Sequence, residues 1–572
     1  QPPGDPRRRV AIVLDDAVIS SPQVAVEIPC GQGLGDGGTT ITGNFDEASA
    51  TELALLIRGG ALPVPVEVVE QRTVGPTLGQ DAIQASLWAA LIGVALTTLY
   101  LIAAYRLLGL ITGIALASYG LLAYALLGSL GAVLTLPGIA GFVLAIGMAV
   151  DANVLVFERA KEERALGKTI RTATKTGFEK ALSAVIDSNV TTLIAAGLLF
   201  ATASGAVKGF GITLALGVLV SMFSALVIVR VIIEWVVSSK RLGSNEKLLG
   251  LTAWRGVARW LDEHQPDLMG RSRLWLSIAA GAVLLSLVGI GTQGVQYGLE
   301  FTGGQLLEYR TEDPVDVDQL RGELVDRGLP RAIVQSSADD QISIRTTELT
   351  ADEQRSIVDA VAERGGELDV LREEFIGPTI GAELRRGALI ALGLALVGQL
   401  LYLAVRFRWT YGAASVIAMF HDVAIVIGVF VWLGRELDGV FLAALLTVVG
   451  YSINDSVVIF DRVRERRALE PDRPLADVTN QAALQTLPRT VNTGMGAWFI
   501  LLALLFLGGD TLTDFALALL VGTLVGTYSS LLVGSPLLLT FERLRAKYAR
   551  PDEDDGKPKG LKPPKRKDGA RV

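Results

Sequence analysis

The sequence predicts an α-helical polytopic membrane protein, with two similar helical bundles in the membrane and small α+β domains outside it. Three observations predict this class: eleven long apolar segments, basic residues concentrated in alternate loops, and an internal repeat with an offset of 302–303 residues. Half of the 572 residues are hydrophobic, 19 % are charged, and the mean hydropathy is +0.45. These values exclude a disordered chain and argue against a soluble cytosolic enzyme.

The composition also limits the chemistry that the protein can perform. A single cysteine, Cys30, excludes an intrachain disulfide framework and a Cys-rich metal site. Only two histidines, His264 and His421, are available for metal binding or proton relays. We therefore expect no cofactor, no metal and no catalytic residues of an enzyme. Any chemistry has to rest mainly on carboxylates, arginines and backbone groups.

Eleven segments are long and apolar enough to cross a membrane. A spanning helix needs about 20 mostly apolar residues, because the hydrocarbon core is about 30 Å thick. The candidate spans are 86–104, 107–128, 136–157, 187–205, 209–237, 274–292, 384–405, 409–433, 438–460, 491–508 and 513–540. The alternative, buried helices of a large soluble core, is disfavoured because such long apolar segments rarely recur this often.

Basic residues set the orientation of these spans. Lys and Arg gather after the third, fifth and ninth spans and in the C-terminal tail, whereas the opposite loops 129–135 and 509–512 contain none. By the positive-inside rule, the basic loops are cytoplasmic. The N-terminal segment 1–85 and the segment 293–383 are then extracytoplasmic. Because no apolar leader precedes residue 85 in this sequence, we expect one further span in the full protein, giving twelve as six plus six.

This orientation divides the sequence into seven parts. They are a first outer domain (1–85), a transmembrane bundle (86–237), a cytoplasmic linker (238–273), a single span (274–292), a second outer domain (293–383), a second bundle (384–540) and a basic cytoplasmic tail (541–572). We expect the tail to lie in solvent near anionic lipid.

Two sequence patterns repeat between the halves of the chain. Val-Gly-Pro-Thr-Leu-Gly at 74–79 recurs as Ile-Gly-Pro-Thr-Ile-Gly at 376–381, each time shortly before a span. Phe-Glu-Arg at 157–159 recurs 303 residues later as Phe-Asp-Arg at 460–462. Both halves enter the membrane from the same side, so the repeat is parallel. Coupling sites in transporters with internal repeats lie near the midplane between the halves.

The two outer segments contain short strands and helices. In the first we expect strands at 10–14, 24–28, 39–42 and 66–69 and a helix at 47–58. In the second we expect a strand at 295–308, a helix at 317–327, two strands, the second at 342–345, a helix at 351–364 and a strand at 368–375. This β-α-β-β-α-β order predicts a ferredoxin-like module. Gly303-Gly304 indicates a kink or turn.

Two aspartates lie inside equivalent spans. Ionisable residues within spans are costly, so they indicate function by default. With the offset of 303 residues, Asp151 aligns with Asn454, and Asp455 aligns with Ala152. Each half therefore contributes one carboxylate at nearly the same depth, and alternating access to the two sides would let these groups bind and release a proton. The alternative for either aspartate alone is a structural hydrogen bond between helices.

From the sequence, we expect further polar residues to lie near these two carboxylates. Arg489 lies at the inner end of a span and is either a counter-ion for an aspartate or a positive-inside anchor. The remaining candidates form a secondary polar network, in which His421 and Asp422 are either a proton relay or a structural pair, and Asn189 and Asn492 share the 303-residue offset. The members of this network are Asn153, Asp187, Asn189, His421, Asp422, Asn454 and Asn492.

At these residues the chain resembles the SecDF family of bacterial protein-export membrane proteins, in which SecD and SecF parts are fused. The SecD-like matches are Leu-Asp-Asp at 14–16 through Ser-Pro at 21–22, Ile-Thr-Gly-Asn-Phe at 41–45, Gly-Ala-Leu-Pro at 60–63, Val-Gly-Pro-Thr-Leu-Gly at 74–79 and Gly-Met-Ala-Val-Asp-Ala-Asn-Val-Leu at 147–155. The SecF-like matches are Phe-Thr-Gly-Gly at 301–304, Gly-Pro-Thr at 377–379, His421-Asp422, Gly-Tyr-Ser-Ile-Asn-Asp at 450–455 and Arg489-Thr490. The resemblance covers almost the whole chain except the basic tail.

The resemblance implies a membrane protein of the bacterial cytoplasmic membrane that uses the proton-motive force to promote preprotein translocation. It implies an RND-like architecture and a proton pathway containing Asp151, Asp455 and Arg489. The partners implied are the SecYEG channel, SecA, YidC- or YajC-type subunits, unfolded preprotein, protons and membrane lipid, with no nucleic acid. Segment 1–85 is then interpreted as the base part of a larger SecD-like outer domain.

Two other functions remain as alternatives at this point. An RND-type exporter of small molecules or lipids would use the same carboxylates, but the second outer segment of about 90 residues is small for a deep substrate cleft. A scaffold that only holds translocase subunits together would not need the carboxylates at all.

Overall fold

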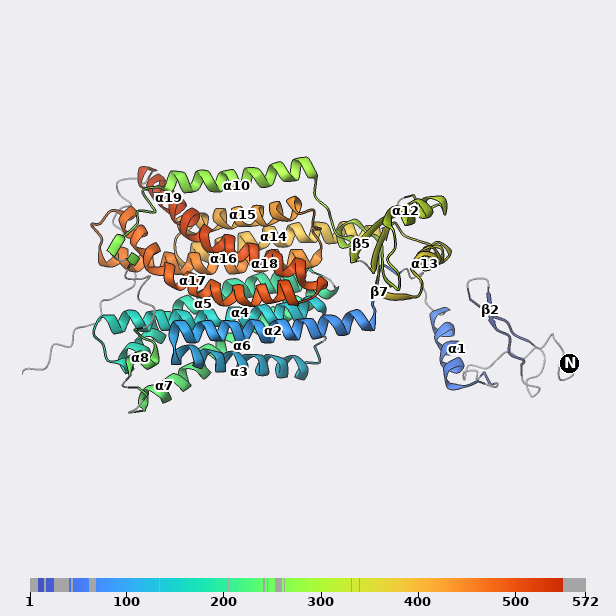
Figure 1. Cartoon of the computed structure of the whole chain (residues 1–572), viewed down its shortest axis with the longest axis horizontal. Helices are drawn as coiled ribbons and strands as arrows, with labels where there is room; N and C mark the ends of the chain where they lie inside the picture. Colours follow the sequence, from blue (N-terminus) through green and yellow to red (C-terminus); the bar gives the residue numbers. More distant parts are fainter. Residues whose placement is uncertain are drawn as a thin grey trace, which may run out of the picture. The chain divides into compact units, whose positions relative to one another are not determined.

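The protein is described here by a computed structural model that forms two units, residues 1–69 and 70–572 (Figure 1). The structure describes residues 9–14, 17–24, 41–42, 45–60, 68–132, 134–203, 205–239, 242–243, 245–252, 260–261, 263–330, 332–338 and 340–548. Cys30, most of the strands expected at 24–28 and 39–42, and the tail after residue 548 lie outside these residues.

The first unit contains a small hairpin and one helix. Strands β1 (Ile12–Leu14) and β2 (Ala17–Ser20) pair antiparallel. Strand β1 lies within the strand expected at 10–14, whereas β2 was not predicted. Helix α1 (Glu47–Gly60) matches the predicted helix and begins after Asp46, whose Oδ1 accepts a hydrogen bond from the backbone N–H of Ser49 at 2.8 Å. This contact caps the first turn of the helix.

The second unit has eleven helical segments that are long and apolar enough to span a membrane, which confirms the predicted number of spans among the described residues. They are α2 (Pro76–Tyr105), α3 (Leu107–Ser129), α4 (Leu136–Ala165), α5 (Ile170–Thr202), α6 (Gly205–Phe223) with η2 (Ser224–Val229) and α7 (Arg230–Ser238), α10 (Ser272–Gln293), α14 (Pro378–Arg406), α15 (Trp409–Trp432), α16 (Gly439–Leu469), α17 (Leu475–Leu507), and α18 (Asp510–Ser529) with η3 (Ser530–Gly534) and α19 (Ser535–Tyr548). A short helix, α8 (Glu246–Leu249), follows α7.

Several helices extend beyond the predicted spans. Helix α5 begins at Ile170 instead of residue 187, and α16 ends at Leu469 instead of residue 460. Many of the basic residues predicted to lie in loops therefore lie on the inner ends of helices. The apolar pattern underestimates such helices because Lys, Arg and Glu form good helices where the chain leaves the hydrocarbon.

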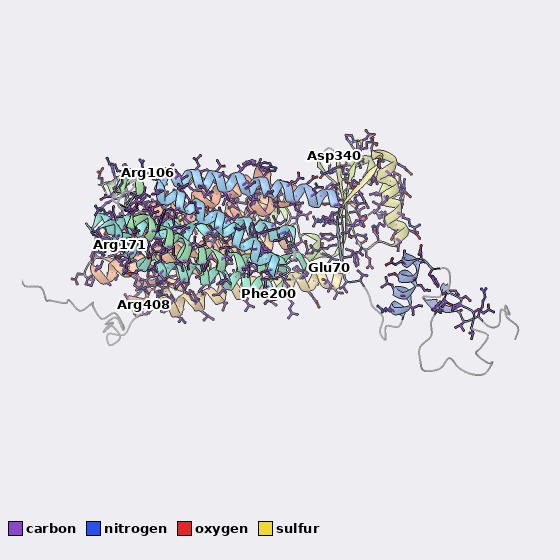
Figure 2. All side chains as sticks on the ribbon, turned by 90° about the horizontal axis from the view of Figure 1, so that it is seen from below. Glu70, Arg106, Arg171, Phe200, Asp340 and Arg408 are labelled. Atoms are coloured by element: carbon purple, nitrogen blue, oxygen red, sulfur yellow. The ribbon has the colours of Figure 1, made fainter. Side chains whose placement is uncertain are left out.

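The charged ends of the second unit agree with the predicted orientation. Arg106, Arg171 and Arg408 lie at one end of the helical bundle, and Glu70 and Asp340 lie at the other (Figure 2). The outer sheet is thus at the end opposite to the basic residues, as the positive-inside rule requires for an extracytoplasmic domain.

The two halves pack around each other reciprocally. In the first half α4 contacts α5 and α6, and in the second half α16 contacts α17 and α18. Across the halves, α2 packs on α17 and α17 on α4, while the repeat-equivalent α14 packs on α5 and α5 on α16. This exchange of partners is the arrangement expected for two parallel repeats related by an axis along the membrane normal.

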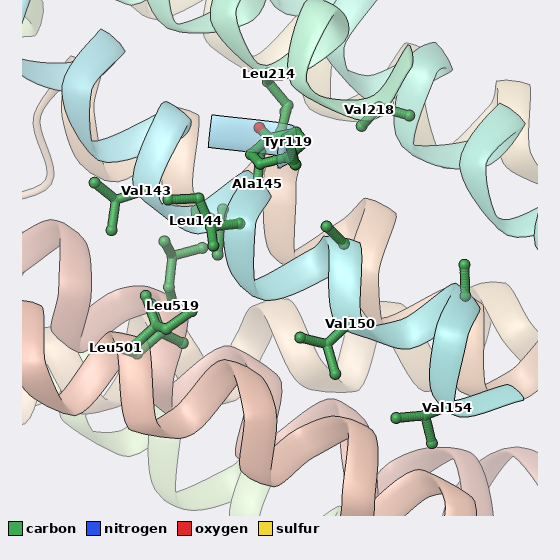
Figure 3. Close-up of a cluster of buried hydrophobic side chains, with 14 of the residues drawn as sticks. Tyr119, Val143, Leu144, Ala145, Val150, Val154, Leu214, Val218, Leu501 and Leu519 are labelled. Carbon is green, nitrogen blue, oxygen red and sulfur yellow. The ribbon is translucent and has the colours of Figure 1, made fainter. Parts of the chain in front are cut away.

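An apolar core joins the halves around α4. Figure 3 shows Val143 and Leu144 of α4 near Leu501 of α17 and Leu519 of α18, with Val150 and Val154 farther along α4. These side chains are buried, and tight van der Waals packing of this kind holds helices together in lipid. The polar residues described below therefore lie in an otherwise apolar interface.

The outer part of the second unit is a five-stranded antiparallel sheet. Its strands are β3 (Glu70–Val74), β4 (Gly304–Thr311), β5 (Ile333–Ala338), β6 (Gln341–Thr346) and β7 (Leu368–Ile376), in the order β3-β7-β4-β6-β5. With α12 (Val317–Asp326) and α13 (Ala351–Gly365), the elements from β4 to β7 have the predicted β-α-β-β-α-β order. Leu307, Tyr309 and Ile344 pack against the helices on one face of the sheet.

Two expectations about this sheet were wrong in detail. The segment expected as a strand at 295–308 begins with a helical turn, α11 (Leu299–Thr302), and β4 starts only at Gly304. The strand expected at 66–69 is instead β3, at Glu70–Val74, which pairs with β7 as a fifth strand. Its sequence Glu-Gln-Arg-Thr-Val has little apolar character, so tertiary pairing decides its conformation.

In each half of the protein, one strand of this sheet continues directly into a membrane helix. Strand β3 continues through Gly75-Pro76 into α2, and β7 continues through Gly377-Pro378 into α14. Proline fits the first turn of a helix because the N–H that it lacks would be unpaired there. Since β3 and β7 are neighbours, the sheet ties the first helices of the two bundles together.

Glycine is required where α11 turns into β4. Gly303 has φ +70° and ψ 168°, a conformation that is essentially restricted to glycine. A Cβ added there would lie 2.8 Å from Cα of Pro378 at the start of α14. The turn therefore allows the sheet and the membrane helix to approach closely.

We predict that Gly303→Ala weakens the sheet by about 1–3 kcal/mol, because it adds backbone strain and a clash with Pro378. Hydrogen–deuterium exchange of the amides of β4 and β7 should accelerate about tenfold for each 1.4 kcal/mol lost. Gly322→Ala is the matched control, since nothing lies within 4 Å of its added Cβ. Unchanged exchange in Gly303→Ala would contradict this assignment.

Candidate functional site

Asp151 is held by hydrogen-bond donors from two other helices. Its Oδ1 accepts from Nη2 of Arg489 at 2.7 Å and from Oγ1 of Thr493 at 3.1 Å, both on α17. Its Oδ2 accepts from Nδ2 of Asn454 on α16. Three donors on one carboxylate are typical of the ionised form, which is an acceptor only.

Asp455 lies on the other side of the same arginine with fewer partners. Its Oδ1 is 3.8 Å from Nη1 of Arg489 and accepts a hydrogen bond from Oγ1 of Thr490 at 3.4 Å. Arg489 thus lies between one carboxylate from each half of the protein. Asp151, Asp455 and Arg489 are 7 %, 5 % and 3 % exposed, and each lies near the middle of its helix.

Small residues allow the helices to come close enough for this arrangement. A Cβ on Gly147 of α4 would lie 3.4 Å from Cα of Ala497, and one on Gly496 of α17 would lie 3.1 Å from Cγ1 of Val150. In the other half, a Cβ on Gly450 would lie 3.4 Å from Cα of Thr192 on α5. Close backbone approach at small residues is the usual way in which helices pack in lipid.

The cluster retains unused hydrogen-bonding capacity. Among the described buried side chains, Nε and Nη1 of Arg489, Oδ1 of Asn454 and Oδ1 of Asn153 have no hydrogen-bond partner. Nδ2 of Asn153 donates to the carbonyl of Ala149 in its own helix at 3.2 Å. Polar groups of this kind can bind internal water, because leaving them unpaired in a low dielectric is costly.

Of the residues predicted as the main site, the structure brings Asp151, Asp455 and Arg489 together. It adds Thr490, known from the sequence only as part of the Arg489-Thr490 match, and Thr493, which had no predicted role. Thr493 lies four residues after Arg489 on the same helix face, and that spacing could have indicated it.

The two asparagines related by the repeat have different surroundings. The Asn492 side chain accepts a hydrogen bond from Tyr100 at 2.7 Å and donates one to Tyr105 at 2.8 Å, both on α2. Tyr105 in turn donates to Oε1 of Glu158 at 2.7 Å. Asn189 instead donates to the carbonyl of Val185 in its own helix at 2.7 Å. Only Asn492 therefore joins helices from different halves by these contacts.

Asp187 forms a separate contact between the halves, away from the central carboxylates. Nε of Arg406 on α14 lies 2.9 and 2.8 Å from its two oxygens, and the hydroxyl of Tyr402 donates to it at 2.9 Å. Arg406 is the last residue of α14, at the basic end of the helix. The contact joins α5 and α14 and is a structural link between the two halves.

His421 and Asp422 form a second buried cluster within the second half. Nδ1 of His421 is 2.9 Å from Oδ1 of Asp422, and its Nε2 is 3.0 Å from the hydroxyl of Tyr528. Oδ2 of Asp422 accepts from Ser452 at 2.5 Å and from Ser529 at 2.8 Å. Ser452 lies three residues before Asp455 on α16, so this cluster is adjacent to the main site along one helix.

An open cavity of about 910 Å³ separates the outer sheet from the outer ends of the helices. Its lining combines apolar and polar residues with charged side chains that include Glu300, Arg345, Arg372, Glu374, Asp438 and Asp514. Asp438 caps α16, since its Oδ1 accepts from the backbone N–H of Phe441 at 2.6 Å. Burial and the neighbouring Glu300 raise the pKa of Asp438 to about 7.

Among the described residues, no group of three or more His, Cys, Asp or Glu side chains is arranged to hold a metal ion. The central site is instead a set of two carboxylates, one guanidinium and several hydroxyl and amide groups. Such a set can bind and release a proton without a cofactor.

We predict that Asp438→Asn stabilises the protein more at pH 8 than at pH 5. Because the carboxyl pKa is raised in the folded state, Asp438 ionises more easily in the unfolded state between about pH 4 and 7. The folded state therefore loses up to ~4 kcal/mol of stability as the pH rises through this window. Asparagine keeps the helix cap and removes the ionisation. Thermal unfolding in detergent at both pH values measures the difference.

The matched control is Asp316→Asn at the start of α12, where an exposed aspartate caps a helix by accepting from Gln319 at 3.0 Å. We expect this change to leave the pH dependence of the midpoint as in the parent protein. An equal gain at both pH values for Asp438→Asn would show that its ionisation does not destabilise the fold.

Comparison with known proteins places the chain among protein-export membrane proteins. Residues 61–239 and 356–544 match the family described as protein export membrane protein SecD/SecF, C-terminal, and residues 288–315 match the SecD/SecF GG motif. Residues 5–64 match the SecDF P1 head subdomain. This last match differs from the expectation that segment 1–85 is the base part of the outer domain.

Similar proteins extend over most of the chain. The protein translocase subunit SecDF of Thermus thermophilus is 42 % identical, covering 94 % of this chain and 72 % of its own length. The subunit of the same name from Bacillus subtilis is 30 % identical, covering 92 % and 72 %. The crystal structure of SecDF from Thermus thermophilus, titled a translocon-associated membrane protein, superposes with a TM-score of 0.76 at 40 % identity over 94 % of this chain and 72 % of that one.

Proposed function

The chain belongs to the SecD/SecF family of protein export membrane proteins, and from that premise we propose that it is a proton-driven accessory subunit of a bacterial Sec translocase. It is a multi-pass protein of the cytoplasmic membrane, with eleven helices suited to span it among the described residues. The observation that carries the proton-driven mechanism is Arg489, buried between one carboxylate from each half.

Charge balance supports a site that binds one proton. Two ionised carboxylates and one guanidinium carry a net charge of −1, which is costly in a low dielectric, and one proton makes the site neutral. Asp151 has three donors, whereas Asp455 has one long hydrogen bond and a more distant guanidinium. We infer that in this conformation Asp151 is ionised and Asp455 holds the proton.

Movement of α17 would exchange the roles of the two carboxylates. This helix contacts both α4 and α16, so a small shift of Arg489 toward Asp455 favours ionisation of that group and leaves Asp151 to take up a proton. One charge that crosses the membrane potential supplies about 2.3 kcal/mol per 100 mV. Unpartnered polar atoms around the arginine offer positions for water that connects the site to either side.

The outer domains would convert this exchange into movement outside the membrane. Strands β3 and β7 are paired in one sheet and continue into α2 and α14, the first helices of the two bundles. A rearrangement between the halves therefore acts on the sheet directly. We propose that the outer domains act on unfolded preprotein leaving the SecYEG channel after the SecA-driven step, with YidC- or YajC-type subunits as further partners.

We predict that Asp151→Asn abolishes the stimulation of export by a proton gradient, because the site then lacks one of its two proton-binding groups. The measurement is preprotein translocation in inverted membrane vesicles with and without an imposed gradient, and the variant should reach only the level seen without a gradient. Glu179→Gln, an exposed carboxylate on α5 with the same change in charge, should behave as the parent protein.

The same vesicles separate this function from its alternatives. A protein that serves only as a scaffold would tolerate Asp151→Asn. A small-molecule exporter would show gradient-dependent dye efflux, lost in the variant, with no effect on preprotein. Either result contradicts the proposed function.

A further inference from the structure

The inner ends of the two central helices are joined by a symmetric set of four charged residues. Arg159 and Glu162 lie near the end of α4, and Arg462 and Glu465 lie at the repeat-equivalent positions of α16, each 303 residues later. We call these four residues the inner quartet. None of them belongs to the carboxylate site described above.

Each arginine of the inner quartet contacts both glutamates. Arg159 lies 3.0 Å from Glu162 in its own helix and 3.3 Å from Glu465 across the interface. Arg462 lies 2.8 Å from Glu465 in its own helix and 3.4 Å from Glu162 across the interface. Two pairs therefore stay within one helix, and two pairs bridge the halves.

The arginines of the inner quartet are largely shielded from solvent. The side chains of Arg159 and Arg462 are 9 % and 15 % exposed, whereas those of Glu162 and Glu465 are 37 % and 32 % exposed. Lys180 of α5 lies beside the group, 4.0 Å from Glu465 and 2.7 Å from Glu163. The quartet thus closes the interface between α4 and α16 from the basic, cytoplasmic end.

Its position along the helices relates it to the carboxylates. Arg159 follows Asp151 by eight residues, and Arg462 follows Asp455 by seven, which at 1.5 Å per residue is about 10–12 Å along each helix. The quartet therefore lies two turns from the proposed proton site, on its cytoplasmic side.

A proton-driven machine needs a barrier at this place. If the carboxylates were open to both sides at once, protons would pass without driving any change. The inner quartet can open at low cost, because each arginine keeps a glutamate of its own helix when α4 and α16 separate. Only the two bridging pairs are lost.

We propose that Arg159, Glu162, Arg462 and Glu465 form the cytoplasmic gate of the proton path, and that the bridging pairs are made when the gate is closed. This inference rests on the proposed function. It assigns the four residues a role in sealing the path, and none in binding the transported proton. The gate opens when the inner ends of α4 and α16 move apart.

The repeat allows a test by charge exchange at constant composition. R159E/E162R and R462E/E465R each keep an opposite-charge pair within the helix but place like charges across the interface. The combination of all four changes restores opposite charges across it. R230E/E234R, which exchanges an exposed pair within α7 at 2.9 Å, is the control for the exchange itself.

We predict that each double variant of the gate raises the leak of protons into proteoliposomes under an imposed pH gradient about tenfold, while the fourfold variant and the α7 control stay near the parent rate. A proton leak at the parent rate in both double variants would contradict the proposed gate. So would a fourfold variant that leaks as fast as they do.

Adding Asp151→Asn to R159E/E162R identifies the route of the leak. The leak should return to the parent rate if protons pass through the carboxylate site, and a persistent leak would overturn the assignment. If a double variant does not assemble, E465Q replaces it, since it weakens one bridging pair and should raise the leak several-fold; an unchanged rate would overturn the gate.

The two proposals fail separately. If Asp151→Asn alone keeps gradient-dependent export, the proposed function is wrong. If it abolishes export while the gate variants remain tight, only the gate is wrong.

Discussion

The structure depends on one buried arginine that has to be neutralised in a low-dielectric interior. Arg489 reaches Asp151 on α4 and Asp455 on α16 only because α17 packs between these helices. A guanidinium without partners in this position would be severely destabilising. The requirement therefore fixes the contact between the two halves, and the glycines that permit close helix packing follow from it.

The sequence predicted most of the fold because its signals are local or periodic. The count of spans follows from apolar length, and the 303-residue offset predicts that Asp151 and Asp455 lie at the same depth. The order of elements in the outer module follows from alternating strand and helix patterns. These features need no knowledge of which helices touch.

Other contacts could not be predicted because they depend on packing between distant segments. Strand β3 has a polar sequence and forms only by pairing with β7. Arg406 reads as a positive-inside residue, yet its partner Asp187 lies on a helix of the other half. A charge pattern sets the orientation of a span but does not say which neighbouring helix faces it.

Because the symmetry of the repeat is imperfect, the two carboxylates of the site have unequal hydrogen-bond partners. With exact symmetry, both aspartates would have equal partners, and a proton would have no preferred position. Instead Asn454 occupies the place that matches Asp151 and donates to it, while Asp455 stands one residue later with fewer donors. The flanking structures remain nearly symmetric: the inner quartet repeats its charges in full, and both halves contribute a strand to the outer sheet. A symmetric frame with an asymmetric centre can adopt two related conformations of unequal proton affinity, which is what the proposed proton-driven cycle requires.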